Sequence, residues 1–594
     1  MKTYRKIIYL IGLISSVFIC SCEDYLEKTQ KADVSEKDIF TNFDNFQGYV
    51  ETMYDDIVDP IHKQASFAEF NNGDDILSTH GPGTTWVRGD YFTIIGNNNS
   101  QYYNTGATRT SGSWNGTSAI RNQAIWQNSW YGIRAANITL AHLKDLVDAT
   151  VEQRDFIEGQ AYFFRGYFHW ELIKAWGSIP YVDTVYTADS DMSRPQLGLY
   201  TLAEKIVSDL QKAADLLPDN WDNTVTGQKT VGINNGRATK GMALANMAEC
   251  LLYNGSPLFN GVATGNYVYN SDYCKRAADA SWKVIELANL GVYGLEPWAT
   301  YSGMFFRKNN TFPRGKEVIF SPPQRGNSRY FTSSFTFGHI GTDAWYSAPT
   351  QNYVELFEMA NGLPVEDPAS GHNLMKPWIN RDPRFYYNIL YNGQRQVTSL
   401  SDSRAFVQFY MGGRERNSIC SLTGFGYRKY WDETLNTFDG GWNQYYYNVP
   451  KIRMSEVYLF YAEAVNEAYG GPSGKVPGAI LTAVDAVNLI RNRAGMPNVN
   501  LKFLGSPEIF RDRIRNERAV ELAYENKRWY DLRRWHIHHL PKYRELYELQ
   551  FDAGYTYFNR VLAKTVEFAE QHYWLPFPVN QITLYPGWKQ NPGW

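Results

Sequence analysis

Segments with an apolar stripe at the helical period recur along this chain of 594 residues, and they limit its fold more than any other feature. In segment 151–176, for example, Phe156, Phe164, Phe168 and Leu172 fall near one face of a 3.6-residue period. Alanine-rich stripes near the C-terminus allow close helix packing, as in helix-turn-helix solenoids. The strict tetratricopeptide consensus, with its period of about 34 residues, is not met. We therefore predict a mainly α fold of paired helices, with helices expected at 35–56, 130–147, 151–176, 200–217, 237–253, 272–288, 451–468 and 479–493.

Two long irregular segments, 70–121 and 296–450, interrupt the helical pattern. Both are rich in glycine and polar residues and carry many aromatic residues. Loops of this length are usually functional or disordered, and disordered segments are poor in aromatic residues. We therefore expect long, function-bearing loops and few short strands on the helical scaffold.

The N-terminus predicts a lipoprotein. Basic residues precede an apolar run at 7–19 that is short for a membrane span and typical of a signal peptide. Ile19-Cys20-Ser21-Cys22 then resembles a bacterial lipobox, which would make 1–21 the signal peptide and Cys22 the lipidated first residue of a mature chain 22–594. Several acyl chains would anchor the protein to a membrane stably. The alternative is an ordinary secretory signal with an incidental cysteine.

Charge and cysteine content narrow the function classes. The net charge is −3 and no basic run stands out, so nucleic-acid binding has no electrostatic support. Cys250, Cys274 and Cys420 lack metal-ligand spacing, and a Cys250–Cys274 disulfide stays open at this stage. The chain has an unusually large number of Trp and Tyr residues, 18 and 43. Their flat apolar faces and polar tips suit wet, half-apolar surfaces such as sugar rings.

Several blocks in order along the chain resemble the SusD/RagB family. They are CEDYL at 22–26, EGQAYFFRGYFHWELIKAWGSIPYV at 158–182, GRATKGMALANMAECLLY at 236–253, LFEMANGLPVEDP at 356–368, INRDPRFYYNI at 379–389, IRNERAVELAYENKRWYDLRRW at 514–535 and LPFPVNQITLYPGWKQNPGW at 575–594. The resemblance implies one SusD-like domain over 22–594, with an N-terminal part at about 22–255 and a central and C-terminal part at about 256–594. It implies four tetratricopeptide-like helix pairs supporting a loop-rich face.

The same resemblance implies a function. Family members are surface-exposed outer-membrane lipoproteins that bind glycans without cleaving them and hand oligosaccharides to a SusC-like TonB-dependent transporter. The expected partners are thus a glycan, such a transporter and the membrane through the N-terminal lipid, with no cofactor and no nucleic acid. A peptide cargo is the variant reading within this class.

Candidate ligand residues come from the two irregular segments, because sugar binding needs flat rings and planar polar groups. We expect loops from the two segments to converge on one site. Any one of these rings has the alternative role of a loop-packing anchor, and Asp74 with Asp75 could instead hold a structural calcium ion. The predicted ligand-binding residues are Asp75, Trp86, Arg88, Tyr91, Trp114, Tyr330 and Trp345, with Asp74, Asn115, Arg325, Asn327 and Phe337 nearby in sequence.

Other motifs predict scaffold contacts. In the expected C-terminal helix, Arg513/Glu517 and Arg518/Glu521 have the spacing of ion pairs within a helix. Trp529, Leu532 and Trp535 should pack this helix on the solenoid. The segment 381–384 predicts a turn held by charge-assisted bonds.

Two rival classes remain. A lipid-anchored glycoside hydrolase needs two carboxylates flanking a cleft, and acidic residues are abundant enough that the sequence leaves this open. No G-x-S-x-G or H-E-x-x-H motif is present, and His536-Ile537-His538-His539 lacks a carboxylate at helical ligand spacing. A protein-binding helical scaffold is the third class, and it predicts buried loop aromatics.

Overall fold

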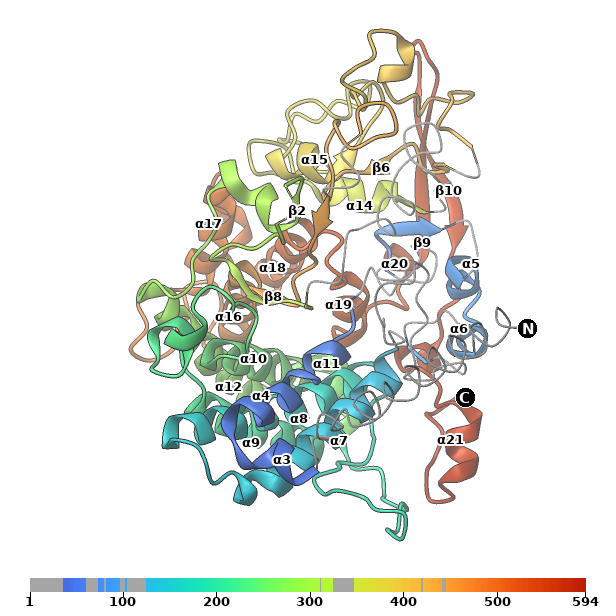
Figure 1. The fold of residues 1–594 in the computed structure, drawn as a ribbon. Helices are drawn as coiled ribbons and strands as arrows, with labels where there is room; N and C mark the ends of the chain where they lie inside the picture. The colour runs from blue at the N-terminus through green and yellow to red at the C-terminus, as the bar shows by residue number, and fades with distance from the viewer. Residues whose placement is uncertain are drawn as a thin grey trace, which may run out of the picture.

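The chain forms a curved stack of helices with a second, loop-rich half packed against it (Figure 1). The computed structural model describes residues 36–59, 73–78, 82–96, 102–103, 124–309, 311–323, 347–417, 420–440 and 445–594. Lipidation of Cys22 lies outside these residues and stays a prediction. Among the described residues, no helix has the length and apolar character needed to cross a bilayer.

The long helices pack in sequence, each against the next. The successive neighbours are α7 with α8, α8 with α9, α9 with α10, α10 with α12, α12 with α16 and α16 with α17. Such nearest-neighbour stacking is the arrangement of a helical solenoid, so the predicted helical-pair scaffold is confirmed. These helices are α7 (Ile125–His142), α8 (Val151–Trp176), α9 (Leu199–Leu216), α10 (Lys240–Gly255), α12 (Ser271–Asn289), α16 (Met454–Ala468) and α17 (Ala483–Arg493).

Local chemistry sets the ends and the packing of α8, the longest of these helices. Thr150 and Gln153 form a reciprocal capping box at its start, and Gly177 ends it with a φ of 73°. Along the helix, a Cβ at Gly159 would lie 2.9 Å from Leu217, and one at Gly166 would lie 3.0 Å from Leu210. The two glycines therefore let α8 approach α9 closely.

Shorter elements complete the described chain. The other helices are α3 (Glu36–Thr41), α4 (Phe43–Glu51), α5 (Pro82–Val87), α6 (Tyr91–Ile95), α11 (Pro257–Thr264), α14 (Gln351–Leu356), α15 (Pro383–Asn388), α18 (Pro507–Glu521), α19 (Arg528–Arg534), α20 (Pro541–Arg544) and α21 (Val579–Leu584). The strands are β1 (Ile76–Ser78), β2 (Phe306–Arg307), β3 (Val318–Phe320), β4 (Ser347–Pro349), β5 (Ile389–Leu390), β6 (Gly426–Tyr427), β7 (Tyr446–Tyr447), β8 (Ile452–Arg453), β9 (Glu545–Phe551) and β10 (Phe558–Thr565). They pair two by two, and the sequence reasoning missed the longest pair, the β9–β10 hairpin at the edge of the molecule (Figure 1).

Two expected helices are broken. The one predicted at 35–56 is α3, α4 and a 3₁₀ turn, because Asn42 leaves the helical region to cap α4 with its side chain. The one expected to run through 514–535 is α18 and α19. Between them Tyr524 and Asn526 have φ values of 59° and 62°, a left-handed conformation that no α-helix contains.

The charged side chains of α18 do not pair within the helix as predicted. Glu517 contacts Arg384 and Arg491 from other segments, and Arg518 contacts Asp531 at 3.0 Å and Glu456 at 3.3 Å. The prediction was wrong because these side chains are buried, where charged groups of other segments lie close enough to pair with them. In the described part of the chain, Glu517, Arg518 and Glu521 of α18 and their partners thus form a buried charged seam between the solenoid and the loop-rich half.

Two predicted scaffold contacts are confirmed. Asp382 caps α15 and accepts a hydrogen bond from the Arg384 Nη2 at 2.8 Å, which holds the turn at 381–384. Trp529, Leu532 and Trp535 are all buried. By contrast, Cys250 and Cys274 are both free and buried, so the structure does not form the disulfide left open above.

Candidate functional site

The short β1–β4 ladder brings the two aromatic-rich segments together. In this antiparallel pair Ile76 lies opposite Pro349 and Ser78 lies opposite Ser347. The chain therefore leaves β1 for the N-terminal loop at the same end at which it enters β4 from the central loop. The expected convergence of the two segments holds for these described ends.

The ladder is fixed to the C-terminal half by Asp74. Its carboxylate accepts two hydrogen bonds from Arg528 of α19, at 2.6 Å from Nε and 2.8 Å from Nη2. Thr350, directly after β4, donates its backbone N–H to the Asp75 carbonyl at 3.0 Å. Sequence reasoning missed Arg528 and Thr350, and no local pattern could have found Arg528, which lies 454 positions from Asp74.

Asp75 is an internal acid. Its side chain is buried, no described residue donates a hydrogen bond to its Oδ1, and Tyr353 and Tyr524 lie near it. Burial, reinforced by Asp74, raises the pKa of the Asp75 carboxyl to about 8. In this structure the residue does not reach the surface, which corrects its assignment as a ligand contact. Calcium binding here stays an untested expectation, and the Asp74 carboxylate is already paired with Arg528.

Trp86 and Tyr91 form an aromatic cluster in the core. They are 6% and 2% exposed, their ring centroids lie 4.3 Å apart, and Trp529 packs on Trp86 with centroids 5.4 Å apart. Rings sealed in this way cannot stack on a sugar, so the prediction that these two face a ligand is corrected. They are loop-packing anchors, the alternative role weighed from the sequence. Arg88, in the turn after α5, is exposed.

The remaining predicted ligand residues, Trp114, Tyr330 and Trp345, lie outside the described residues and stay predictions. Trp345 precedes the first residue of β4 by two positions in the sequence.

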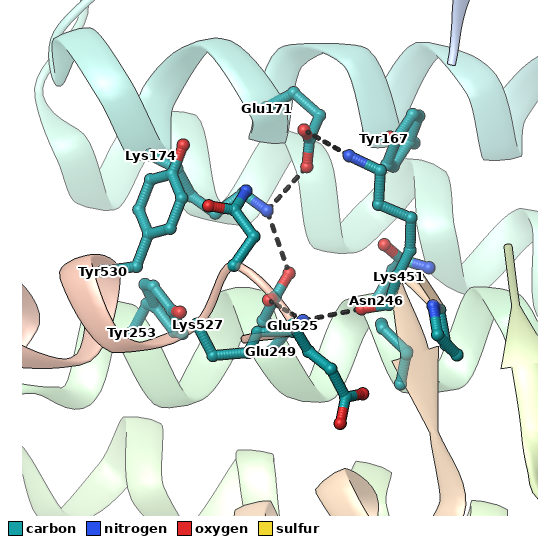
Figure 2. A pocket seen from close by; sticks show the side chains of 13 residues that line it. Tyr167, Glu171, Lys174, Asn246, Glu249, Tyr253, Lys451, Glu525, Lys527 and Tyr530 are labelled. Atoms are coloured by element: carbon teal, nitrogen blue, oxygen red, sulfur yellow. Dashed lines mark hydrogen bonds and ion pairs between the residues drawn. The ribbon is translucent and has the colours of Figure 1, made fainter. Parts of the chain in front are cut away.

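An internal cavity lies where the solenoid meets the C-terminal half (Figure 2). Lys174 lies 2.6 Å from Glu171 and 3.4 Å from Glu249, and Lys451 approaches Glu171 at 3.5 Å. Burial alone would raise the pKa of Glu171, but Lys174 and Lys451 outweigh it and hold the pKa at about 2. The cavity measures about 20 Å³, room for a water molecule and not for a sugar.

The histidine cluster shows no metal site. His538 is 1% exposed, neither ring nitrogen has a hydrogen-bond partner in the part of the chain that the structure describes, and burial lowers the pKa of His538 to about 3. His536 Nε2 lies 3.0 Å from the Glu570 carboxylate, and the His536 ring packs against His539 with centroids 5.3 Å apart. Within the described ranges, no group of three or more candidate ligands has the geometry to hold a metal ion.

A helical-pair solenoid carrying a loop-rich half, with two distant segments joined at one ladder, defines the class of this protein as a helical-repeat scaffold that carries long loops. Two family models match it: residues 316–594 match the SusD family, and residues 24–233 match a family described as starch-binding and associating with the outer membrane. The chain belongs to the SusD/RagB family.

Similar proteins agree with this assignment. SusD-like protein P2 of Formosa agariphila is 24% identical over 69% of this chain and 71% of its own length. SusD-like protein P25 of the same organism is 21% identical over 99% of this chain and 98% of its own. A SusD-like protein of Bacteroides fragilis shares the fold with a TM-score of 0.71 at 22% identity, covering 94% of this chain and 99% of its own.

Proposed function

We propose that this protein captures a glycan at the outer membrane, without cleaving it, and delivers it to a SusC-like TonB-dependent transporter. The observation that carries the proposal is the β1–β4 ladder, which roots both aromatic-rich segments at one place on a rigid frame. Family membership supports the ligand class, since one matching family is described as starch-binding and associating with the outer membrane. Cys22 would supply the lipid anchor.

The absence of catalysis is part of the proposal. A glycosidase needs two carboxylates about 5–9.5 Å apart around an open cleft. In the described chain, the acids that meet at the cavity of Figure 2 are engaged by lysines and enclose about 20 Å³. That space does not admit a sugar ring.

The test is a panel of polysaccharides offered to protein lacking residues 1–22, with binding and released reducing ends measured together. We expect micromolar to millimolar binding to at least one polysaccharide and no released ends. Trp114→Ala, Tyr330→Ala and Trp345→Ala should leave the unfolding midpoint unchanged while at least one abolishes binding. Tyr267→Ala, which removes a 43%-exposed ring outside both irregular segments, is the matched control.

Turnover of any polysaccharide would favour the hydrolase instead. Normal binding by all three loop variants would remove the site assignment, and silence across the panel would favour a protein-binding scaffold or a peptide cargo. Delivery is tested separately, by co-purification of the lipidated protein with the transporter from outer membranes.

A further inference from the structure

A second and larger cavity opens between the solenoid and the start of the central loop. It measures about 410 Å³, within the range of small-ligand sites, and so differs from the water-sized cavity of Figure 2. Its wall comes from the end of α4, the turn before α10 and the segment around β3. The residues that matter below are Glu51, Ile233, Arg237, Arg314, Val318 and Pro322.

Arg314 supplies an uncompensated positive charge to this cavity. No hydrogen bond or ion pair of its guanidinium occurs among the described residues. A Cβ at Gly236 would lie 3.5 Å from its Nη2, so the group lies over a backbone that has no side chain to block it. The guanidinium lies over the Phe312 ring, with Cζ 5.2 Å from the ring centroid, and burial lowers the pKa of Arg314, as expected of a buried cation without an ion pair.

The other charges of the cavity cancel each other. The Arg237 Nη2 lies 2.6 Å from Glu51 Oε1, and the Arg237 Nη1 donates to Asn234 at 2.7 Å. The described lining therefore carries one net positive charge, located at Arg314. A planar guanidinium binds carboxylates and sulfates through paired N–H groups.

The rest of the lining is largely apolar. Met242, Val318, Ile319 and Pro322 line it, and Ile233 at 74% exposure is an aliphatic surface open to solvent. Such a wall suits the C–H face of a sugar ring, and Arg314 suits an acidic substituent on that ring.

We propose that this cavity binds an acidic saccharide unit, one carrying a carboxylate or a sulfate ester, with Arg314 as the residue that selects it. The inference rests on the proposed glycan capture and specifies a second subsite, separate from the one proposed beside the β1–β4 ladder. The cavity reaches Pro323, and β4 follows later in the same irregular segment, 296–450.

The experiment compares methyl β-D-glucuronide with methyl β-D-glucoside, which differ only at C6, a carboxylate in the first and a hydroxymethyl group in the second, by ligand-observed NMR titration of protein lacking residues 1–22. We expect the glucuronide to bind at least about tenfold more tightly, because a charge-assisted bond is at stake. Arg314→Gln should abolish that preference, and Arg314→Lys should retain part of it. Arg404→Gln, which removes the same charge from an exposed arginine paired with Asp402, should keep it in full.

Glucose 6-sulfate is titrated as well, because it carries a sulfate ester in place of the carboxylate, and a preference for either acidic sugar over the glucoside supports the site. Three results would overturn the proposal: neither acidic sugar binding more tightly than the glucoside, an unchanged preference in Arg314→Gln, or inorganic sulfate alone binding as tightly as the preferred acidic sugar. The loop variants Trp114→Ala and Trp345→Ala should keep the preference. If those variants lose polysaccharide binding while the parent protein shows no preference for an acidic sugar, this subsite is refuted and the proposed function stands.

Discussion

The buried charged seam predicts that Glu521→Gln is one of the most damaging single-atom changes in the chain. The Glu521 carboxylate is 2.7 Å from Arg453 and 3.1 Å from Arg384, it also contacts Arg493, and its side chain is fully buried. An amide of the same shape keeps the volume but places an N–H₂ against a guanidinium. Breaking a buried pair by removing one partner costs about 3–5 kcal/mol.

The assay is urea unfolding followed by circular dichroism and by tryptophan fluorescence, with Glu204→Gln as the matched control. Glu204 pairs with Arg276 at 2.6 Å, but the two side chains are 52% and 40% exposed, so its loss should cost less than about 1 kcal/mol. If Glu521→Gln shifts the midpoint no further than Glu204→Gln, the seam does not stabilise the fold and the reasoning is refuted.

The same residue gives a pH test with a definite sign. Burial raises the pKa of Glu521, but Arg493, Arg453 and Arg384 outweigh it and hold the pKa well below its ordinary value of 4.5. A depressed carboxyl pKa stabilises the fold above 4.5, and that stability is lost as the pH falls toward the folded-state pKa. Glu521→Gln should therefore lose part of the acid sensitivity of the parent protein.

Three further predictions concern single residues. Because the pKa of Asp75 is raised to about 8, the folded state favours the protonated carboxyl; this contribution to stability is present below pH 3.8 and declines as the pH rises to about 8. Asp75→Asn should flatten that decline in unfolding midpoints measured from pH 4 to 9, and an unchanged slope would contradict the burial argument. Trp86→Ala should lower the free energy of unfolding by about 3–5 kcal/mol as a core truncation, whereas an unchanged midpoint would return this ring to the candidate ligand contacts. Burial raises the thiol pKa of Cys250 and Cys274, so in protein lacking residues 1–22 a thiol reagent should label Cys420 first and the other two only after unfolding.

The sequence predicts the long helices well because their pattern is local. The helix expected at 272–288 is observed as Ser271–Asn289, and that at 200–217 as Leu199–Leu216. Each has an apolar stripe facing a neighbour that is close in sequence, so period and caps are enough. Ile480 shows the limit: it falls within the helix predicted at 479–493, yet it is 83% exposed because α17 begins only after its cap residue, Thr482.

The candidate site was less predictable because its defining contacts are not local. β1 and β4 have three residues each, and their pairing joins positions about 270 apart, as Ser78 and Ser347 show. Trp86 and Arg88 are neighbours in a polar, aromatic segment, yet one is core and the other is exposed. Composition alone cannot distinguish a ring that anchors a loop from one that the loop presents.

Buried charge-assisted bonds connect the solenoid to the loop roots in an unbroken series. Arg534 of α19 binds Glu463 of α16, a helix near the C-terminal end of the stack, with contacts of 2.5 and 2.7 Å. In the same short helix Arg528 binds Asp74 beside β1.

Because such bonds fix direction as well as distance, the roots of both aromatic-rich segments are held in place before any ligand arrives. The entropy of bringing the two roots together is then lost on folding and not on binding, which favours affinity for a weakly interacting ligand such as a glycan. Arg528→Lys, which removes the paired hydrogen bonds to Asp74, should therefore weaken glycan binding although it changes no loop residue.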